Sequence, residues 1–519
     1  MPICAMWRAV RGLPHSWALC APVARSARCR RGCGRCHRAR PAMSRPYDVA
    51  VIGCGAGGYQ AAVSAAQCGA RVVLIERAGA GGACLNRACV PKKAVAHVAS
   101  VLATAHGLLG RGLAGAMCGD LAAMMAHEEA LVADLRRGFP QRLKALAIDL
   151  VAGHARLQSA HAIVVSGDRG TTTIEARRVI LAAGARPRPL PACPIDGERV
   201  VAADRLIPLL ASEPKRLLCL GGGATGVEAA FVFRAFGAEV TLATRGDRLL
   251  ARPMISERAA RLLERRLSES GVTILKGVSV IATQVDDAGV TVRFQDGREG
   301  RFDRVLVAVG SVPRTDDIGY RALGVRCDSE GFVATRETLE TSVPGIYAVG
   351  DMKGGPMTAA AALHDGRIAG ENAALGGHRR RNYHQVPLVI DSILPLAAVG
   401  LSEDLAERAG FAPEVVYIPY GASVKARAQG ASAGFIEIVH DEETGQMLGG
   451  CVAGGGADEL VHLVLAACRS RRGLWSLADL DYGHPSYGEE LGAAVSAHLA
   501  GFMRSRPTVF RPGIYAFRD

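Results

Sequence analysis

The sequence has no long apolar run and no acidic residue near its start, and both absences exclude classes of protein. No stretch of about 18 apolar residues occurs, so a transmembrane helix is not expected. The 62 basic residues outnumber the 49 acidic ones, which alone would suggest a partner such as nucleic acid. However, residues 1–45 hold ten of the arginines, and the other 52 basic residues nearly balance the acidic ones. Neither nucleic acid nor a membrane is therefore expected as a partner.

The Arg-rich segment 1–45 lacks the periodicity of a packed helix, so no folded domain is expected there. One interpretation is an organellar transit peptide, which would place the protein in an organelle matrix. The other is that translation begins at Met43 and the protein is cytoplasmic. We favour the second, because the mixture of Arg, Ala, Cys and Gly is typical of read-through from a GC-rich upstream region.

Five of the fifteen cysteines precede Met43. Cys29, Cys33 and Cys36 have the spacing of iron–sulfur ligands, and the stretch from Cys33 to His37 matches a haem-attachment pattern. Nothing around them supplies a cofactor pocket, so no metal site is expected. Outside this segment only Cys84 and Cys89 stand close together. This usage is typical of a reducing compartment with one catalytic pair, and not of a secreted disulfide scaffold.

A glycine motif follows the first apolar run and indicates a dinucleotide site. Residues 47–52 predict a buried parallel strand, and residues 71–76 predict a second strand that ends in an acid, Glu76. The glycines let the backbone approach a pyrophosphate, the helix N-terminus favours its charge, and the carboxylate accepts from ribose hydroxyls. Between the two strands the motif consists of Gly53, Gly55 and Gly58.

The same pattern recurs in the middle of the chain, where residues 216–220 predict a strand and residues 240–244 a second one. At the position of the acid this sequence has Thr244 followed by Arg245. Loss of the carboxylate removes repulsion against a 2′-phosphate, and an arginine can bind that phosphate, so this site is expected to prefer NADPH. The alternative is that Arg245 is a solvated surface residue. The glycines of this second motif are Gly221, Gly223 and Gly226.

Between the two motifs lie Cys84 and Cys89, in a C-x4-C arrangement. On an ideal helix their Cα atoms would be about 8–9 Å apart, whereas a disulfide tolerates at most about 7 Å. Bridging must distort the turn, and strained disulfides are easier to reduce, so the pair is interpreted as catalytic. Arg87, which lies between them, is expected to favour the thiolate.

The segment GGACLNRACVPKK, residues 81–93, resembles the redox signature of the pyridine nucleotide–disulfide oxidoreductases. The resemblance runs from about Tyr47 to about Leu499, and residues 341–351 match the family's second FAD-binding motif closely. It implies an α/β fold with two Rossmann-like dinucleotide-binding domains, for FAD and NAD(P), and a C-terminal α+β dimerisation domain. The implied boundaries are 46–190 and 321–383 for the FAD-binding parts, 191–320 for the NAD(P)-binding domain and 384–519 for the interface domain.

The resemblance also implies roles for the redox residues. Cys89 would face the flavin, and Cys84 would exchange with the substrate disulfide. His484 would act as acid and base, oriented by Glu489, because a neutral imidazole with a carboxylate partner can move a proton near pH 7. In this family the site is completed across a homodimer, so both residues would serve the cysteines of the partner subunit.

The remaining implied site residues belong to the two cofactor sites. Asp351 would bind the flavin ribitol, and Lys93 would lie near the flavin, paired with Glu228 from the second nucleotide-binding helix. Pairing is physically reasonable because burying either charge alone is costly. Gly310 ends the strand that returns from the NAD(P)-binding domain.

Two signals differ on the kind of family member. Residues 84–86 resemble dihydrolipoyl dehydrogenase, whereas residues 89–93 and 244–245 resemble glutathione reductase. We expect a dihydrolipoyl-dehydrogenase-like enzyme acting on a small disulfide or a lipoyl group, with the lipoyl domain of a 2-oxoacid dehydrogenase complex as one candidate. An NADPH-dependent low-molecular-weight disulfide reductase is the alternative. The last fifty residues contain no cysteine, which sets aside members with a C-terminal redox pair. A third hypothesis is a flavin-binding scaffold without catalysis.

Overall fold

The computed structural model describes residues 45–168, 170–315 and 318–505. From Pro46 onward the chain forms one compact unit. Residues 1–44, and with them the cysteine patterns at Cys29, Cys33 and Cys36, lie outside the described residues. Of the helices that the structure describes, none has both the length and the apolar character needed to cross a membrane.

The first sheet is built around β1 (Tyr47–Ile52), which is buried along most of its length. It pairs in parallel with β2 (Val72–Glu76) on one side and with β6 (Gly170–Leu181) on the other. A strand from much later in the chain, β17 (Ile346–Ala348), pairs in parallel with β6. The sheet also contains β3 (Asp149–Ala152), β4 (His154–Leu157) and β5 (Ala162–Gly167).

The second sheet repeats the parallel arrangement around β9 (Arg216–Leu220). Its strand order is β11-β10-β9-β15-β8, so the order reverses between the neighbours β9 and β15 and leaves a crevice at the carboxyl ends of the strands. The other strands are β8 (Val200–Ala202), β10 (Glu239–Ala243), β11 (Thr273–Leu275) and β15 (Arg304–Val307). A separate antiparallel sheet follows, of β12 (Val280–Asp286), β13 (Gly289–Phe294) and β14 (Glu299–Phe302).

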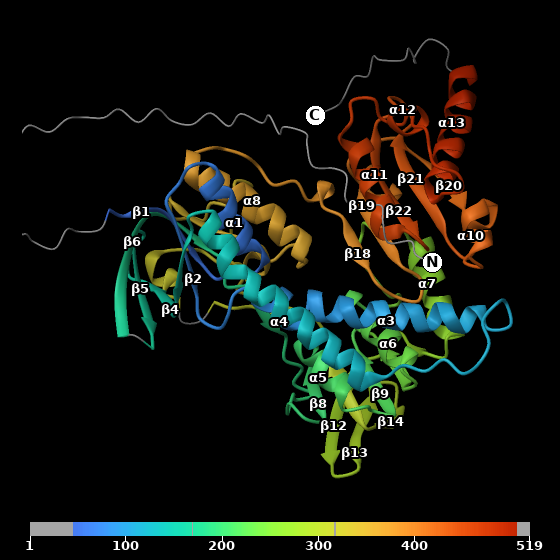
Figure 1. Cartoon of the computed structure of the whole chain (residues 1–519), viewed down its shortest axis with the longest axis horizontal. Helices are drawn as coiled ribbons and strands as arrows, with labels where there is room; N and C mark the ends of the chain where they lie inside the picture. The colour runs from blue at the N-terminus through green and yellow to red at the C-terminus, as the bar shows by residue number, and fades with distance from the viewer. Residues whose placement is uncertain (1–44, 169, 316–317, 506–519) are drawn as a thin grey trace, which may run out of the picture. The chain divides into compact units, whose positions relative to one another are not determined.

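Helices pack against both of these sheets. We call the part of the chain built on the sheet around β1 the first nucleotide-binding unit, and the part built on the sheet around β9 the second. In the first unit, α1 (Ala56–Gln67) packs against α8 (Ala359–Leu375), where Gly366 and Gly370 allow a close approach. In the second unit, α6 (Ala224–Ala235) packs against α3 (Cys89–Leu108), a helix that crosses the middle of the molecule in Figure 1. The helices between the units are α2 (Gly82–Arg87), α3 (Cys89–Leu108) and α4 (Leu121–Ala145).

The C-terminal part is an antiparallel sheet with helices against it (Figure 1). The strand order is β18-β19-β22-β21-β20, and the central strands β21 (Phe435–Asp441) and β22 (Met447–Ala453) are buried throughout. Leu491, Val495 and Leu499 of α13 (Tyr487–Ser505) join the core on one face. The remaining elements are β18 (Leu388–Ile390), β19 (Leu396–Gly400), β20 (Pro413–Pro419) and α11 (Ala457–Arg469). The first sheet, with a parallel core and an antiparallel edge of β4 and β5, the parallel second sheet and this third sheet confirm the expected α/β fold.

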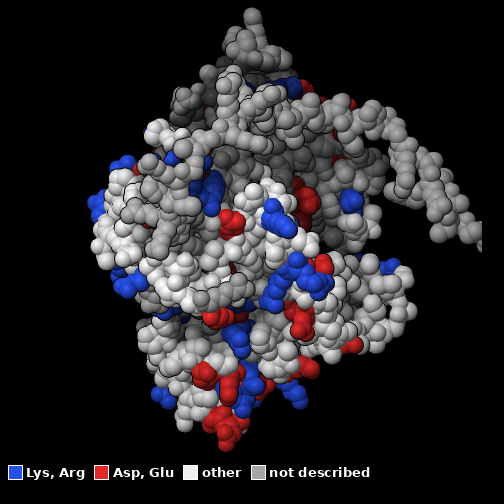
Figure 2. Space-filling view, turned by 60° about the vertical axis from the view of Figure 1, so that its left-hand side comes forward, with Lys and Arg blue, Asp and Glu red and all other residues white. Residues whose placement is uncertain are grey.

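Charges of both signs are interspersed over the described part of the face shown in Figure 2. This mixture agrees with the near balance of basic and acidic residues after position 45. A surface of alternating charges does not produce the extended positive field by which polyanions are attracted.

Candidate active site

The two glycine motifs have the same backbone geometry. A Cβ added to Gly53 would lie 2.4 Å from the carbonyl oxygen of Ala182, and one added to Gly221 would lie 2.3 Å from that of Ala308. Both glycines also have positive φ angles, 103° and 118°, which other residues rarely adopt. The turn at the end of each first strand therefore requires glycine.

The third glycine of each motif is required for packing and the second for access. A Cβ on Gly58 or Gly226 would lie 1.9 Å from the carbonyl oxygen of the motif's first glycine. A Cβ on Gly55 or Gly223 would instead meet no protein atom within 4 Å and would fill the space in front of the helix N-terminus. An open cradle at a helix N-terminus fits a pyrophosphate.

The two units differ at the end of their second strand. Glu76 accepts hydrogen bonds from the backbone N–H of Cys54 at 2.7 Å and of Ala78 at 2.8 Å. In the second unit the buried Thr244 occupies the corresponding place, and Arg245 is exposed. The first unit thus presents a fixed carboxylate at its ribose position, and the second presents a cation beside an uncharged side chain.

Both motifs open into one cavity of about 2240 Å³. This volume exceeds the roughly 300–1,000 Å³ typical of a pocket for one small molecule, so the cavity can accommodate more than one nucleotide cofactor. Gly226 packs behind the second loop and is not part of the lining. The predicted site residues that line the cavity are Gly53, Gly55, Gly58, Glu76, Cys84, Cys89, Lys93, Gly221, Gly223, Glu228, Arg245, Gly310 and Asp351.

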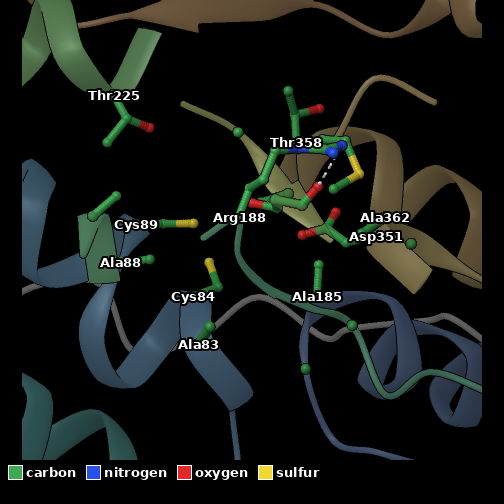
Figure 3. A pocket seen from close by; sticks show the side chains of 18 of the residues that line it. Ala83, Cys84, Ala88, Cys89, Ala185, Arg188, Thr225, Asp351, Thr358 and Ala362 are labelled. Carbon is green, nitrogen blue, oxygen red and sulfur yellow. Dashed lines mark hydrogen bonds between the residues drawn. The ribbon is translucent and has the colours of Figure 1, made fainter. Parts of the chain in front are cut away.

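The cysteine pair lies where one helix ends and the next begins. Cys84 belongs to α2, Cys89 starts α3, and Ala88 between them leaves the helical region with φ −129° and ψ −93°. Pro91 explains the break, because it has no N–H to donate to the carbonyl of Arg87 but is tolerated in the first turn of a new helix. Figure 3 shows both cysteine side chains on one side of the cavity, with Asp351 across from them.

The two thiols are free in this structure and have opposite acidities. A hydrogen bond from Cys84 to Cys89 raises the pKa of Cys84, and burial raises it further. The same hydrogen bond lowers the pKa of Cys89 to about 7, against the effect of burial and with the help of the nearby Lys92 cation. Of the two thiols, Cys84 therefore keeps its proton and Cys89 is the one that ionises to the thiolate near neutral pH.

The lysine predicted to pair with Glu228 was wrong by one residue. Lys92, and not Lys93, forms the ion pair with Glu228, which is only 2% exposed. Lys93 pairs instead with Asp391, whose backbone N–H donates to Glu228 at 3.2 Å. Both lysines follow Cys89 by three or four residues and share its helix face, so the direction from which α6 approaches decides between them.

The cation expected beside the thiolate also differs. Arg87 lies 3.8 Å from the carboxylate of Asp204, and its side chain is 45% exposed. Lys92 supplies the positive charge at Cys89 instead, because the ion pair with Glu228 holds its side chain inside the cavity wall.

Asp351 sits beside a buried polar network that sequence analysis did not find. β17 returns the chain to the first sheet, and Asp351 follows in a short 3-10 turn, Gly350–Lys353. Lys353 lies 3.2 Å from Asp365, which also accepts from the hydroxyl of Tyr383 at 2.9 Å and from the N–H of Gly350 at 3.2 Å. This network fixes the turn, and burial raises the pKa of Asp351.

His484 and Glu489 pair as the sequence predicts. Nδ1 of His484 lies 2.9 Å from a carboxylate oxygen of Glu489 at the start of α13. The imidazole is 73% exposed, and neither residue lines the cavity that contains the cysteines. A histidine that is oriented by an acid but exposed on its own subunit is suited to a site completed by a second subunit.

Comparison with known proteins agrees with this geometry. Residues 47–366 match the family model described as pyridine nucleotide-disulphide oxidoreductase. Residues 386–495 match the dimerisation domain of the same family. A dihydrolipoyl dehydrogenase from Thermus scotoductus is 35% identical over 456 residues, covering 87% of this chain and 97% of that protein. Dihydrolipoyl dehydrogenase 3 from Pseudomonas aeruginosa is 32% identical over 468 residues, covering 88% and 99%.

Two solved structures have the same fold. LpdA from Mycobacterium tuberculosis superposes with a TM-score of 0.80 at 27% identity, covering 87% of this chain and 99% of that chain. The HOCl-induced flavoprotein disulfide reductase RclA from Escherichia coli gives a TM-score of 0.75 at 27% identity, covering 86% and 99%.

Proposed function

Because the chain belongs to the pyridine nucleotide-disulphide oxidoreductase family, we propose that it is an enzyme of the dihydrolipoyl dehydrogenase type. It would move electrons between a nicotinamide nucleotide and a dithiol or disulfide substrate through FAD and the pair Cys84 and Cys89. One observation carries the proposal: the pair lies in the same cavity as both glycine motifs, with opposite shifts in the pKa of its two thiols.

In the direction of disulfide reduction, Cys84 first gives its proton to His484 of the partner subunit. The Cys84 thiolate attacks one sulfur of the substrate disulfide, and the other sulfur leaves as a thiolate that takes the proton from the imidazole. Cys89 then attacks the Cys84 sulfur, forms the internal disulfide and releases the second substrate thiolate. The two cysteines thus give two electrons to the substrate, and the dehydrogenase direction reverses each step.

Bound FAD would supply the two-electron chemistry that restores the dithiol from a nicotinamide hydride. The first glycine motif and Glu76 would hold its adenosine and pyrophosphate, and Asp351 would hold its ribitol. Lys92 and Glu228 keep a paired charge against the cysteines, where an unpaired charge would be costly. The second glycine motif, Arg245 and Gly310 would bind the nicotinamide nucleotide.

We propose NADPH as the preferred nucleotide, because the second unit has Thr244 and the exposed Arg245, and no carboxylate, at the end of its second strand. The same observation favours a second candidate function, an NADPH-dependent reductase of glutathione-type or other small disulfides. The dihydrolipoyl interpretation relies on the relatives, which carry that name at 32–35% identity. A lipoyl domain of a 2-oxoacid dehydrogenase complex is its natural macromolecular substrate.

The dimerisation-domain match supports a homodimer, and the exposed His484 requires one for activity. We propose the cytoplasm as its location, in keeping with its relatives from the bacteria Thermus scotoductus and Pseudomonas aeruginosa. A dimer in which one subunit carries His484→Gln and the other Cys84→Ser retains one complete site. It should regain about half of the wild-type activity per dimer, whereas each homodimeric variant stays inactive.

The experiment that tests the function is a set of initial rates with NADH and NADPH, each with lipoamide and with glutathione disulfide. NADH with lipoamide as the best pair would support the dehydrogenase and contradict the role of Arg245. NADPH with glutathione disulfide would support the reductase. Cys84→Ser should retain flavin and still oxidise the nucleotide in a single turnover, yet lose disulfide reduction. Normal disulfide turnover by that variant would refute the relay.

A further inference from the structure

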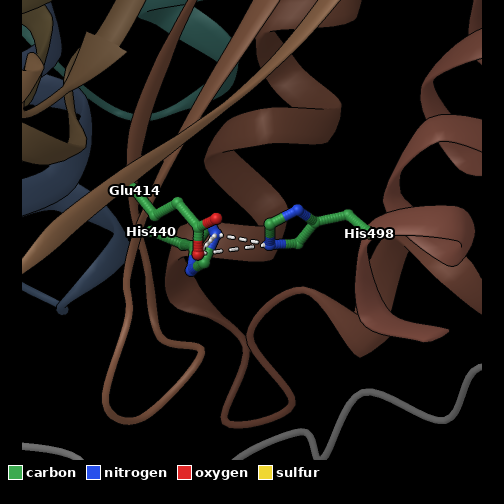
Figure 4. Close-up of side chains that lie close together, drawn as sticks. All are labelled: Glu414, His440 and His498. Atoms are coloured by element: carbon green, nitrogen blue, oxygen red, sulfur yellow. Dashed lines mark hydrogen bonds and ion pairs between the residues drawn. The ribbon is translucent and has the colours of Figure 1, made fainter. Parts of the chain in front are cut away.

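A second cluster of reactive side chains lies in the C-terminal sheet, outside the redox cavity. Glu414 on β20 and His440 on β21 are direct cross-strand partners, so both side chains project from the same face. His498 reaches the same point from α13 (Figure 4). His440 is fully buried, whereas the side chains of His498 and Glu414 are 20% and 42% exposed.

The three potential ligand atoms form a nearly regular triangle. Nε2 of His440 and Nε2 of His498 are 3.0 Å apart, and a carboxylate oxygen of Glu414 lies 3.6 Å from the first and 3.5 Å from the second. Ligands bound tetrahedrally at about 2.0–2.1 Å lie roughly 3.3–3.4 Å from one another. An ion about 2.0–2.1 Å from all three atoms would sit slightly out of their plane, as tetrahedral geometry requires.

The hydrogen bonding of His440 leaves its Nε2 with a lone pair. Its Nδ1–H donates to the backbone carbonyl of Asp441 at 3.2 Å, which fixes the tautomer and the ring orientation. The potential ligand atoms of Glu414, His440 and His498 therefore converge on one point, where a single cation can bind all three.

We propose that Glu414, His440 and His498 bind a borderline divalent metal ion, with Zn²⁺ as the best match. Two imidazole nitrogens and one carboxylate oxygen suit Zn²⁺, Ni²⁺ or Cu²⁺ and not Mg²⁺ or Ca²⁺, which prefer oxygen ligands alone. The three protein ligands leave a fourth position for water. The ion clamps α13 to the edge of the sheet, nine residues along the helix from Glu489, or about 13–14 Å at 1.5 Å per residue.

Zinc binding to the chelator-treated full-length chain tests the proposal. The measurement is made in a background that carries Ser in place of Cys84, Cys89, Cys29, Cys33 and Cys36, because the redox dithiol and the three cysteines with metal-ligand spacing would themselves bind zinc. We expect one zinc ion per chain by calorimetric titration with ZnCl2 and no binding of MgCl2. Glu414→Gln and His498→Ala, at the two partly exposed positions, should each weaken binding by more than the roughly tenfold that loss of an outer partner costs. His378→Ala, an exposed histidine outside the cluster, is the matched control and should leave the Kd unchanged.

Two further measurements separate a metal site from a hydrogen-bonded cluster and from misfolding. Zinc should raise the Tm of the background protein and of His378→Ala by several degrees, and not that of His498→Ala. X-ray absorption at the zinc edge should show nitrogen and oxygen neighbours at about 2.0–2.1 Å and no sulfur at about 2.3 Å. Absence of zinc binding, sulfur scattering, or an unchanged Kd in both Glu414→Gln and His498→Ala would overturn the proposal.

Discussion

The two nucleotide-binding units share their backbone and differ in the side chains at one corner. In both, the first glycine lies close to the backbone that follows a neighbouring strand, β6 or β15. The third glycine lies close to the carbonyl of the first, and the second glycine faces the cavity. At the end of the second strand, however, one unit has Glu76 with two backbone hydrogen bonds, and the other has Thr244 followed by an exposed Arg245. The comparison teaches that the repeated backbone provides for a pyrophosphate in general, while two or three side chains decide which dinucleotide is held.

The largest effect is expected from substitutions that disrupt the glycine motif of one unit and leave the other motif intact. Gly58→Val places a side chain where a Cβ alone would lie 1.9 Å from a carbonyl oxygen, and Gly226→Val does the same in the second unit. Gly58→Val should be purified without flavin. Gly226→Val should keep its yellow colour but oxidise NAD(P)H at least about a hundredfold more slowly, since each motif positions its own pyrophosphate.

The ratio of flavin to protein absorbance and the rate of nucleotide oxidation measure both outcomes. Glu76→Ala is a milder variant of the first unit, for use if Gly58→Val does not fold. Retention of flavin by both first-unit variants would show that the first unit is not the flavin site.

The next effect concerns the corner of the second unit. Arg245→Ala should raise the KM for NADPH by about 10–100-fold, because a hydrogen bond to a charged group contributes about 1.5–3 kcal/mol. The KM for NADH should change little, since NADH carries no 2′-phosphate. Steady-state kinetics with both nucleotides check this, and equal effects on the two would show that Arg245 does not contact the phosphate.

A smaller change, in the preference between NADH and NADPH, is expected when the second unit is given an acid at the position that corresponds to Glu76. Thr244→Glu places a carboxylate at the end of β10, as Glu76 stands at the end of β2. The ratio of kcat/KM for NADH over NADPH should rise several-fold, because the carboxylate accepts from ribose hydroxyls and repels a 2′-phosphate. Thr244→Gln is the uncharged control and should shift the ratio less than the acid does.

The smallest effect is expected from removing the ion pair between Lys92 on α3 and Glu228 on α6, which connects the two units. In the wild-type dithiol, the Cys89 thiolate is lost as pH falls through about 7, the pKa that Lys92 helps to lower. Replacing the pair together, Lys92→Gln with Glu228→Gln, leaves no unpaired charge. It should raise the pKa of Cys89 by roughly one unit, so the thiolate is lost at higher pH.

The pH dependence of iodoacetamide alkylation, with the modified cysteine identified by mass spectrometry, measures this pKa. The neighbouring pair offers a matched control, since Lys93→Gln with Asp391→Asn removes the same charges one residue further along the helix. An unchanged midpoint in the first double variant, or an equal shift in the control, would contradict the role of Lys92.

Features that a short stretch of chain determines could be predicted from the sequence. Each glycine motif is local, because its turn, helix start and strand lie within about thirty residues, and both appear where the pattern places them. The pairing of His484 with Glu489 is local too, and the structure forms it at 2.9 Å.

Features that depend on how distant elements meet could not be predicted. The sequence does not say from which side α6 approaches α3, so it could not choose Lys92 over Lys93. The proposed metal site could not be predicted for the same reason, since it depends on the cross-strand register of Glu414 with His440 and on the placement of α13. No ligand spacing within one segment signals such a site.

β17 is synthesised long after β6, the strand with which it pairs, and this order affects how the protein folds during its synthesis on the ribosome. The second unit is contiguous and has all its strands once Val307 has emerged, but one edge of β6 waits for Ile346–Ala348. At about 5–20 residues per second, synthesis from Leu181 to Ile346 takes roughly 10–30 s. During that time the nascent chain carries an unpaired strand edge, which is a site for misassociation and for chaperones. Stalled nascent chains ending shortly before and after β17 emerges should therefore differ in protease resistance in the first unit and not in the second.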